Sequence, residues 1–279
     1  MLNSTRRAAA GESLLGEMGR YVRLYGLFLK QRLKILLEYR VNFLIGASST
    51  VSEQAAGLLM VWVVMRQIPN LVGWSFYEIL LIYGLVVLAK SINHMFADNL
   101  WTIGHDYIRS GGFDRFLVRP INPLFHLLAD RFCHDGVGNF IVGLALTVTA
   151  LRTLGIALTP LTALYLVVVV LSGGAIFIAL NLITCTSAFW IVESVPVTRM
   201  VFELHEFAKF PLTIYQRGIG LLLTWLIPYG FASYYPASYL LGRDPSLIAW
   251  ISPLVAAVLL VIAYRVWLFG LSHYAGTGS

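Results

Sequence analysis

Long apolar stretches alternate with short polar ones along most of the chain. Six of these stretches are long enough to cross a bilayer, because a membrane-spanning helix needs about 20 mainly apolar residues. They cover residues 41–66, 77–97, 134–157, 161–190, 211–233 and 247–270. The pattern predicts an all-α integral membrane protein with six transmembrane helices.

Residues 18–40 carry too many charges to span a bilayer. On a helical wheel Arg20 and Lys30 share one face, while Tyr21 and Phe28 share the other. This pattern predicts an amphipathic helix lying in the membrane interface, although an ordinary basic helix beside a membrane has the same pattern. The predicted division of the chain is a flexible tail (1–17), the interfacial helix (18–40), a transmembrane domain (41–270) with a polar loop at about 98–133, and a tail (271–279).

Composition supports a membrane protein. The chain is 58% hydrophobic and only 12% charged, and its mean hydropathy is +0.76. The two cysteines, Cys133 and Cys185, lie near or inside apolar stretches, as small core residues do, and do not suggest a disulfide framework. The net charge of +6 needs no nucleic-acid partner, because excess Lys and Arg usually mark the cytoplasmic face of a membrane protein.

The distribution of Lys and Arg predicts the orientation. With the N-terminus inside, fourteen lie in the inner segments 1–40, 98–133 and 191–210, and three lie in the outer loops. Basic residues accumulate on the cytoplasmic side, so both termini are expected to be cytoplasmic.

One polar stretch, IRSGGFDRFLVRPIN at 108–122, has the signals of a fixed shape. Gly111 and Gly112 can end a helix with a left-handed cap. Pro120 stops the next turn, and Asn122 before Pro123 can cap a new helix.

The piece between these breaks is a short amphipathic helix. Phe113 and Phe116 fall on one side, and Asp114 and Arg115 on the other. It is either an interfacial elbow resting on lipid headgroups or a docking knob for a cytoplasmic partner.

Motifs for catalysis are absent from the sequence. There is no G-x-x-x-x-G-K-[ST] phosphate loop and no G-x-S-x-G, so no catalytic residue is predicted. His205 and Glu206 begin the zinc motif H-E-x-x-H, but Lys209 occupies the position of the second His. No metal site is therefore expected.

Polar residues inside the predicted spans form the other candidate site. Asn42, Ser49 and Glu53 share one stripe of the first span, and Asn181 marks a weaker stripe in the fourth. A buried carboxylate in a membrane is costly unless it faces protein or water. The stripe is either helix packing or a wall of a path through the membrane or of an interface with a second chain.

The run I-x-x-G-G-x-D-x-x-L-V-R-P-x-N-P-L at 108–124 resembles the ABC-2 type permease family, in particular its six-span branch that works with a separate ATPase. The stretches at 206–242 and 267–279 are similar to the same branch, except for His273 where that branch has an arginine. The resemblance covers about residues 18–279.

The resemblance implies a permease subunit of an ATP-driven exporter in the plasma (bacterial inner) membrane. Its partners would be two nucleotide-binding ATPase subunits, which hold the ATP and Mg, and a second permease chain, identical or homologous. This chain would carry no cofactor.

Phe113 and Phe116 would seat a coupling helix in an ATPase groove. The coupling residues would be Gly111, Gly112, Phe113, Asp114, Arg115, Phe116, Arg119 and Pro120. The alternatives are an ion-coupled secondary transporter, which usually shows inverted repeats, and a membrane scaffold or enzyme.

Overall fold

The computed structural model describes residues 14–38, 40–68, 70–133, 135–191, 193–243 and 247–274, and these residues are helical apart from connecting turns and one isolated bridge. The long helices are α2 (Leu14–Glu38), α3 (Arg40–Gln67), α4 (Phe76–Ala97), α7 (Asp135–Thr153), α8 (Pro160–Cys185) and α12 (Ser252–Ser272). The short ones are α5 (Asp114–Leu117), α6 (Pro123–Asp130), α9 (Val195–Glu203), α10 (Arg217–Leu221) and α11 (Tyr234–Leu240). The predicted all-α class is confirmed for this part of the chain.

Four helices among the described residues are long and apolar enough to cross a membrane: Phe76–Ile108, Asp135–Thr153, Pro160–Phe189 and Ser252–Ser272. The first extends α4 through a 3-10 turn (Asp98–Thr102) and a π-helical turn (Ile103–Ile108), and the third extends α8 through Thr186–Phe189. Helix α3 has 28 residues, which suffices in length, but Glu53 and its other polar residues make it less apolar.

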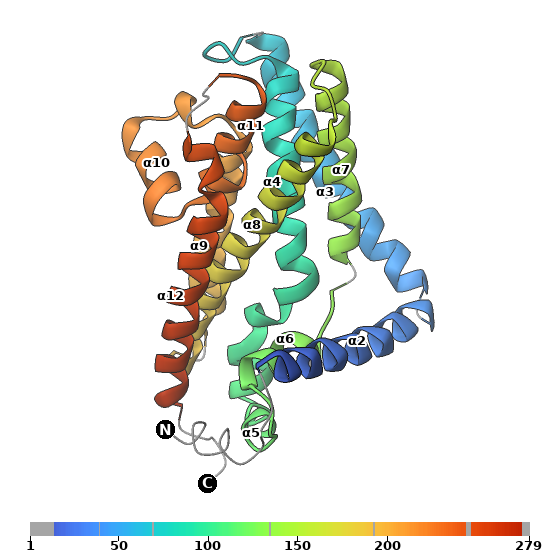
Figure 1. Ribbon diagram of the computed structural model, residues 1–279, viewed down its shortest axis with the longest axis vertical. Coiled ribbons are helices and arrows are strands. Elements are labelled where there is room, and N and C mark those ends of the chain that lie inside the picture. Colours follow the sequence, from blue (N-terminus) through green and yellow to red (C-terminus); the bar gives the residue numbers. More distant parts are fainter. Residues whose placement is uncertain are drawn as a thin grey trace.

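The continuous helix predicted over 211–233 is wrong. The chain there folds into short pieces at Leu212–Ile214, α10, Leu222–Leu226 and Tyr229–Ala232. The apolar helix Arg217–Leu226 falls short of the length that a bilayer core requires. Pro211 and Pro228 explain the breaks, because proline cannot donate a helical hydrogen bond and disfavours helix in the residue before it. Figure 1 shows these orange segments folded beside the upper half of α12.

Helix α4 forms the centre of the bundle, with buried side chains on almost every side between Ile79 and Lys90. A helix that is apolar all round belongs in a core rather than at a surface. It crosses α7 at two glycines: a Cβ on Gly84 would meet the Thr147 backbone nitrogen at 2.9 Å, and one on Gly143 would meet that of Leu88 at 2.9 Å. Small residues let the two backbones approach this closely.

Helix α2 lies across the lower end of the bundle, at a steep angle to the other long helices (Figure 1). Tyr21 packs edge-on against Phe125 of α6, with ring centroids 4.7 Å apart. Arg23, Lys30 and Lys34 are exposed, so the polar side of α2 faces away from α6.

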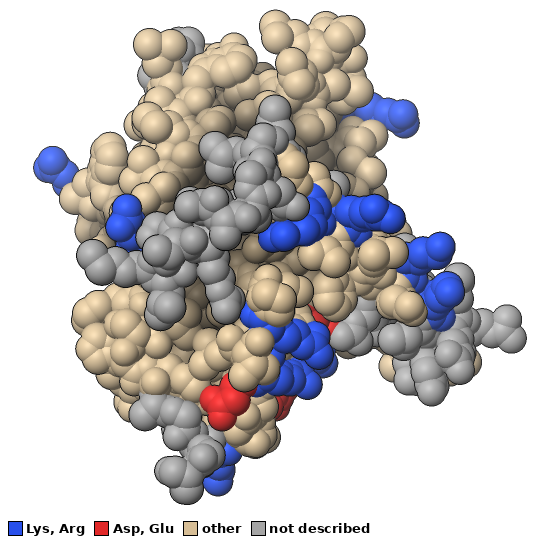
Figure 2. Space-filling view, turned by 60° about the horizontal axis from the view of Figure 1, so that its bottom comes forward, with Lys and Arg blue, Asp and Glu red and all other residues tan. Residues whose placement is uncertain are grey.

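We call the end that carries α2, α5, α6 and the last turn of α12 the basic end. Figure 2 turns this end forward and shows Lys and Arg gathered on it. The predicted tails lie mostly outside the described residues. Only 14–17, in α2, and 271–274, at the end of α12, are described.

Candidate functional site

The segment 108–122 sits at the basic end and has the predicted caps. Gly111 has φ +70°, the left-handed conformation that ends a helix. The backbone N–H of Phe113 donates to the Tyr107 carbonyl at 2.8 Å, which folds the chain back on the preceding turn. Asn122 accepts hydrogen bonds from the backbone N–H groups of Leu124 and Phe125 at 2.9 and 3.2 Å. Both breaks are therefore stabilised locally, and the segment has a defined shape.

The face predicted to seat in a partner is instead turned into the chain itself. Phe113 and Phe116 are both 0% exposed. Phe113 contacts Phe189, Trp267 and Tyr274, with ring centroids 5.5, 6.1 and 5.0 Å apart. The expectation that these two rings face an ATPase groove is wrong, because the ends of α8 and α12 already bury Phe113.

Phe116 anchors the other end of α5. Its ring lies 4.6 Å from the His126 ring and 5.4 Å from the Tyr107 ring. Aromatic pairs at these separations add to the stabilisation from area burial. Together the two phenylalanines fix α5 to α4, α6, α8 and α12, so α5 cannot move without moving the bundle.

Polar contacts fix the same segment. The Tyr274 hydroxyl donates to Asp114 at 2.9 Å, and burial together with this carboxylate raises the pKa of Tyr274 to about 12. Arg115 pairs with Asp130 at 3.2 Å and lies over the Phe116 ring at 4.9 Å. These contacts tie α5 to the C-terminal end of α12 and to the end of α6.

Arg119 contacts His126, with Nη1 and Nε2 3.1 Å apart. Arginine has only donors, so Nε2 must be the unprotonated nitrogen of the ring. Burial, and then the Arg119 charge, lower the pKa of His126 below its usual range. This contact holds the end of the segment against α6 only while the ring is neutral.

The outward surface of the segment is small and apolar at its tip. Leu117 is 42% exposed and Val118 is 82% exposed. Arg115, Arg119 and Pro120 are exposed beside them. We call these five residues the coupling tip. It differs from the predicted docking face, since Leu117 and Val118 take the place of the phenylalanines.

A second polar site lies where α3 meets α4. Lys90 is 9% exposed, and its Nζ lies 3.3 Å from Glu53 Oε1. The Glu53 side chain is 59% exposed. The pair lies on a cavity of about 120 Å³ whose lining residues are Glu53, Lys90, Asn93, His94, Asp98, Trp101, Asn139 and Phe202.

A chain of hydrogen bonds runs beside this cavity. The Tyr83 hydroxyl donates to Gln54 Oε1 at 3.1 Å, and Gln54 Nε2 donates to Asn139 Oδ1 at 3.0 Å. Asn139 Nδ2 then contacts His94 Nδ1 at 3.2 Å. Buried polar groups need such partners, so this network joins α3, α4 and α7. Sequence reasoning missed these residues because the partners are up to 85 positions apart.

The predicted stripe is only partly assembled. Glu53 reaches the cavity, whereas Ser49 is exposed on α3. Asn181 of α8 is buried and donates to Asn93 Oδ1 at 3.2 Å and to the Ala97 carbonyl at 3.1 Å. It does not line the cavity itself but holds Asn93, which does. Asn42 lies in α3, but its side chain is outside the described part.

A second charged cluster follows α9. Lys209 Nζ lies 2.5 Å from Glu206 and 5.0 Å from the centroid of the Tyr83 ring. His205 lies 3.0 Å from the same carboxylate. The negative charge of Glu206 thus has two partners, and the cluster packs against α4 through Tyr83.

Comparison with known families gives one finding. A family model described as "ABC-2 family transporter protein" matches residues 51–278, from within α3 to the C-terminal region. Neither the curated proteins nor the solved structures give a match.

Proposed function

Since the chain belongs to the ABC-2 transporter family and is a membrane permease of that kind, we propose that it couples ATP hydrolysis on two separate ATPase subunits to export of a substrate. The sequence has no phosphate loop, so the ATP and Mg would be held by the partners. A second permease chain, identical or homologous, would complete the translocation path.

The coupling tip carries this proposal. Its inner side is fixed to the bundle through Phe113 and Phe116, while Leu117 and Val118 point outward. A closing ATPase can move a bundle only through a connection that does not bend. The buried aromatic contacts supply that stiffness, and the exposed tip supplies a surface for the partner.

The orientation supports the same function. The fourteen-to-three distribution of Lys and Arg predicts that the basic end faces the cytoplasm, where ATP is present. The membrane would then be the plasma membrane, which in bacteria is the inner membrane. Glu53 and the exposed Ser49 would lie on the side of α3 that faces the path or the second permease.

The rival interpretation is an elbow that rests on lipid headgroups. It also needs an apolar tip with arginines at its edge, because such side chains suit a membrane interface. The two interpretations differ in what Val118 contacts, and an acidic substitution separates them.

The test is a Val118→Asp substitution in the full-length chain, expressed in its own host and extracted in mild detergent. We expect the wild type to retain an ATPase that contains a G-x-x-x-x-G-K-[ST] motif, identified by mass spectrometry. Val118→Asp should lower the ratio of ATPase to permease at least about tenfold, since one lost anchor costs about 2 kcal/mol. Its Tm should change little.

The matched control is Leu158→Asp, since Leu158 is 61% exposed in the loop between α7 and α8, which lies at the opposite end. It should leave the ATPase ratio unchanged. An unchanged ratio in Val118→Asp, or no ATPase with the wild type, would favour the lipid elbow or an ion-driven transporter instead.

A further inference from the structure

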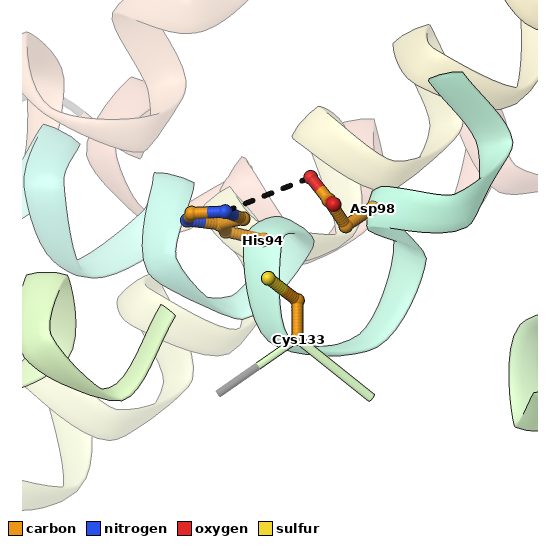
Figure 3. Close-up of side chains that lie close together, drawn as sticks. All are labelled: His94, Asp98 and Cys133. Atoms are coloured by element: carbon orange, nitrogen blue, oxygen red, sulfur yellow. Dashed lines mark ion pairs between the residues drawn. The ribbon is translucent and has the colours of Figure 1, made fainter. Parts of the chain in front are cut away.

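Three side chains with metal-binding atoms meet at the base of the 98–133 loop. They are His94 and Asp98 of the extended α4 and Cys133, just before α7. One ligand atom from each lies within 4.8 Å of the others. Figure 3 shows the Cys133 sulfur pointing toward the space between the imidazole and the carboxylate. No metal site was expected from the sequence, because Asp98 and Cys133 are 35 positions apart.

Backbone packing brings the three together. His94 and Asp98 are four residues apart on a helix, which places them on one face with Nε2 and Oδ1 3.6 Å apart. The Cys133 N–H donates to the Met95 carbonyl at 3.1 Å, which fixes the linker against α4. A Cβ on Gly136 would lie 2.8 Å from the Met95 backbone nitrogen, so only glycine lets α7 start this close.

The ligand set matches one class of ion. Imidazole nitrogen, thiolate sulfur and carboxylate oxygen are the donors that Zn²⁺ takes, whereas Mg²⁺ and Ca²⁺ prefer oxygen alone. Three protein ligands leave a fourth position open, and the neighbouring cavity of about 120 Å³, which His94 and Asp98 also line, has room for a water there.

A second residue orients the imidazole. Asn139 contacts His94 Nδ1 at 3.2 Å, so the other ring nitrogen, Nε2, is the one that faces Asp98. Metal-binding histidines commonly have such a partner on the nitrogen that does not bind the ion. With an ion on Nε2, Nδ1–H would donate to the Asn139 carbonyl oxygen after the amide turns over, and Gln54 and Tyr83 can exchange donor and acceptor roles to match.

We propose that His94, Asp98 and Cys133 bind a Zn²⁺ ion that closes the base of the loop carrying the coupling tip. The ion would tie the end of α4 to the linker before α7. A metal ion that joins the two ends of a long loop reduces the conformational freedom of the unfolded chain and stiffens the folded one. This proposal rests on the three side chains alone and does not depend on the proposed function.

The first test measures the metal directly. Full-length protein, freed of any histidine tag, is stripped with EDTA, dialysed against Zn²⁺ and analysed for its metal content. We expect one Zn²⁺ per chain in the wild type, and a Tm that rises with Zn²⁺ and falls again with EDTA. Cys133→Ser and Asp98→Asn should lose both effects, and Asn139→Ala should weaken the affinity at least about tenfold.

The control is Cys185→Ser, because Cys185 is buried in α8 and belongs to no such group among the described residues. It should keep both the ion and the Tm shift. A second measurement uses the rate at which a maleimide modifies Cys133 in the Cys185→Ser background. Zn²⁺ should slow this reaction at least about tenfold, and Asp98→Asn should remove the protection. Wild type that retains no Zn²⁺, or Cys133→Ser and Asp98→Asn variants that retain as much Zn²⁺ as wild type, would overturn the proposal.

Discussion

Phe113 lies edge-on against Tyr274, with ring centroids 5.0 Å apart, and so joins α5 to the C-terminal end of α12. The Tyr274 hydroxyl also bonds to Asp114, the residue after Phe113, at 2.9 Å. Two parts of the chain 160 positions apart are thus held as one unit. A force on the coupling tip would reach α12 directly, as well as α4.

Truncating Phe116 should destabilise the chain itself. Its side chain is 0% exposed between Tyr107 and His126. Replacing a buried Phe by Ala typically costs about 3–5 kcal/mol, so Phe116→Ala should lower the Tm clearly. Val118→Ala removes an exposed side chain and should change stability by less than about 0.5 kcal/mol. Thermal unfolding of both variants in detergent checks this, and equal Tm values would contradict the buried position of Phe116.

Acid should loosen the end of the segment through His126. Burial and Arg119 lower its pKa, so the folded chain favours the neutral ring. Just below pH ~6.5, the ordinary pKa of His, the unfolded chain therefore binds more protons than the folded one. This contribution to stability is complete above that pH and decreases as the pH falls toward the lower, folded-state pKa.

The measurement compares the Tm at pH 7.5 and 5.5 for wild type and His126→Gln. Glutamine cannot take up the proton but can still accept from Arg119. Its Tm should decrease less between the two pH values than that of the wild type. Parallel curves for the two proteins would show that His126 makes no contribution.

Local signals in the sequence were sufficient for the caps of segment 108–122. Gly111 adopts a positive φ because no side chain opposes it, and Asn122 caps α6 because its side chain reaches two free N–H groups. Such contacts involve residues a few positions apart. They depend on residue type and spacing, which the sequence contains.

The surface that buries Phe113 and Phe116 could not be predicted from such local signals. An amphipathic turn shows which side is apolar but not which surface covers it. The cover here comes from Phe189 and Trp267, which lie 76 and 154 positions after Phe113. The break in the predicted span at 211–233 was missed for another reason: total hydrophobicity outweighed the prolines at either end.

The orientation can be checked by thiol labelling in a background that lacks Cys133 and Cys185. Ser110 is exposed beside the coupling tip, and Leu158 is 61% exposed at the other end. In intact cells an impermeant maleimide should modify Leu158→Cys but not Ser110→Cys, because positive charge predicts that the basic end is inside. Lysed cells, in which both should react, are the control. Labelling of residue 110 from outside would reverse the topology and remove the coupling tip from the ATPase.

Substitutions of Glu53 and Lys90 test whether the cavity beside them serves transport or only contributes to the packing of the helices. Lys90 is 9% exposed, while the Glu53 side chain is 59% exposed, so Glu53 is the less buried partner of the pair. Glu53→Gln should therefore cost about 1 kcal/mol or less in stability. Lys90→Met removes the more buried charge and leaves Glu53 without this cation. The stability lost in the double variant should be smaller than the sum of the losses in the two single variants, with a coupling of about 0.5 kcal/mol or more, since the residues are in contact.

If the cavity belongs to the translocation path, Glu53→Gln should also change ATP hydrolysis of the purified permease–ATPase complex at an unchanged ATPase ratio. Ser52→Ala, on the adjacent exposed face of α3, is the matched control and should leave that rate alone. Additive stabilities together with wild-type hydrolysis in every variant would show that the two charges neither interact nor serve transport.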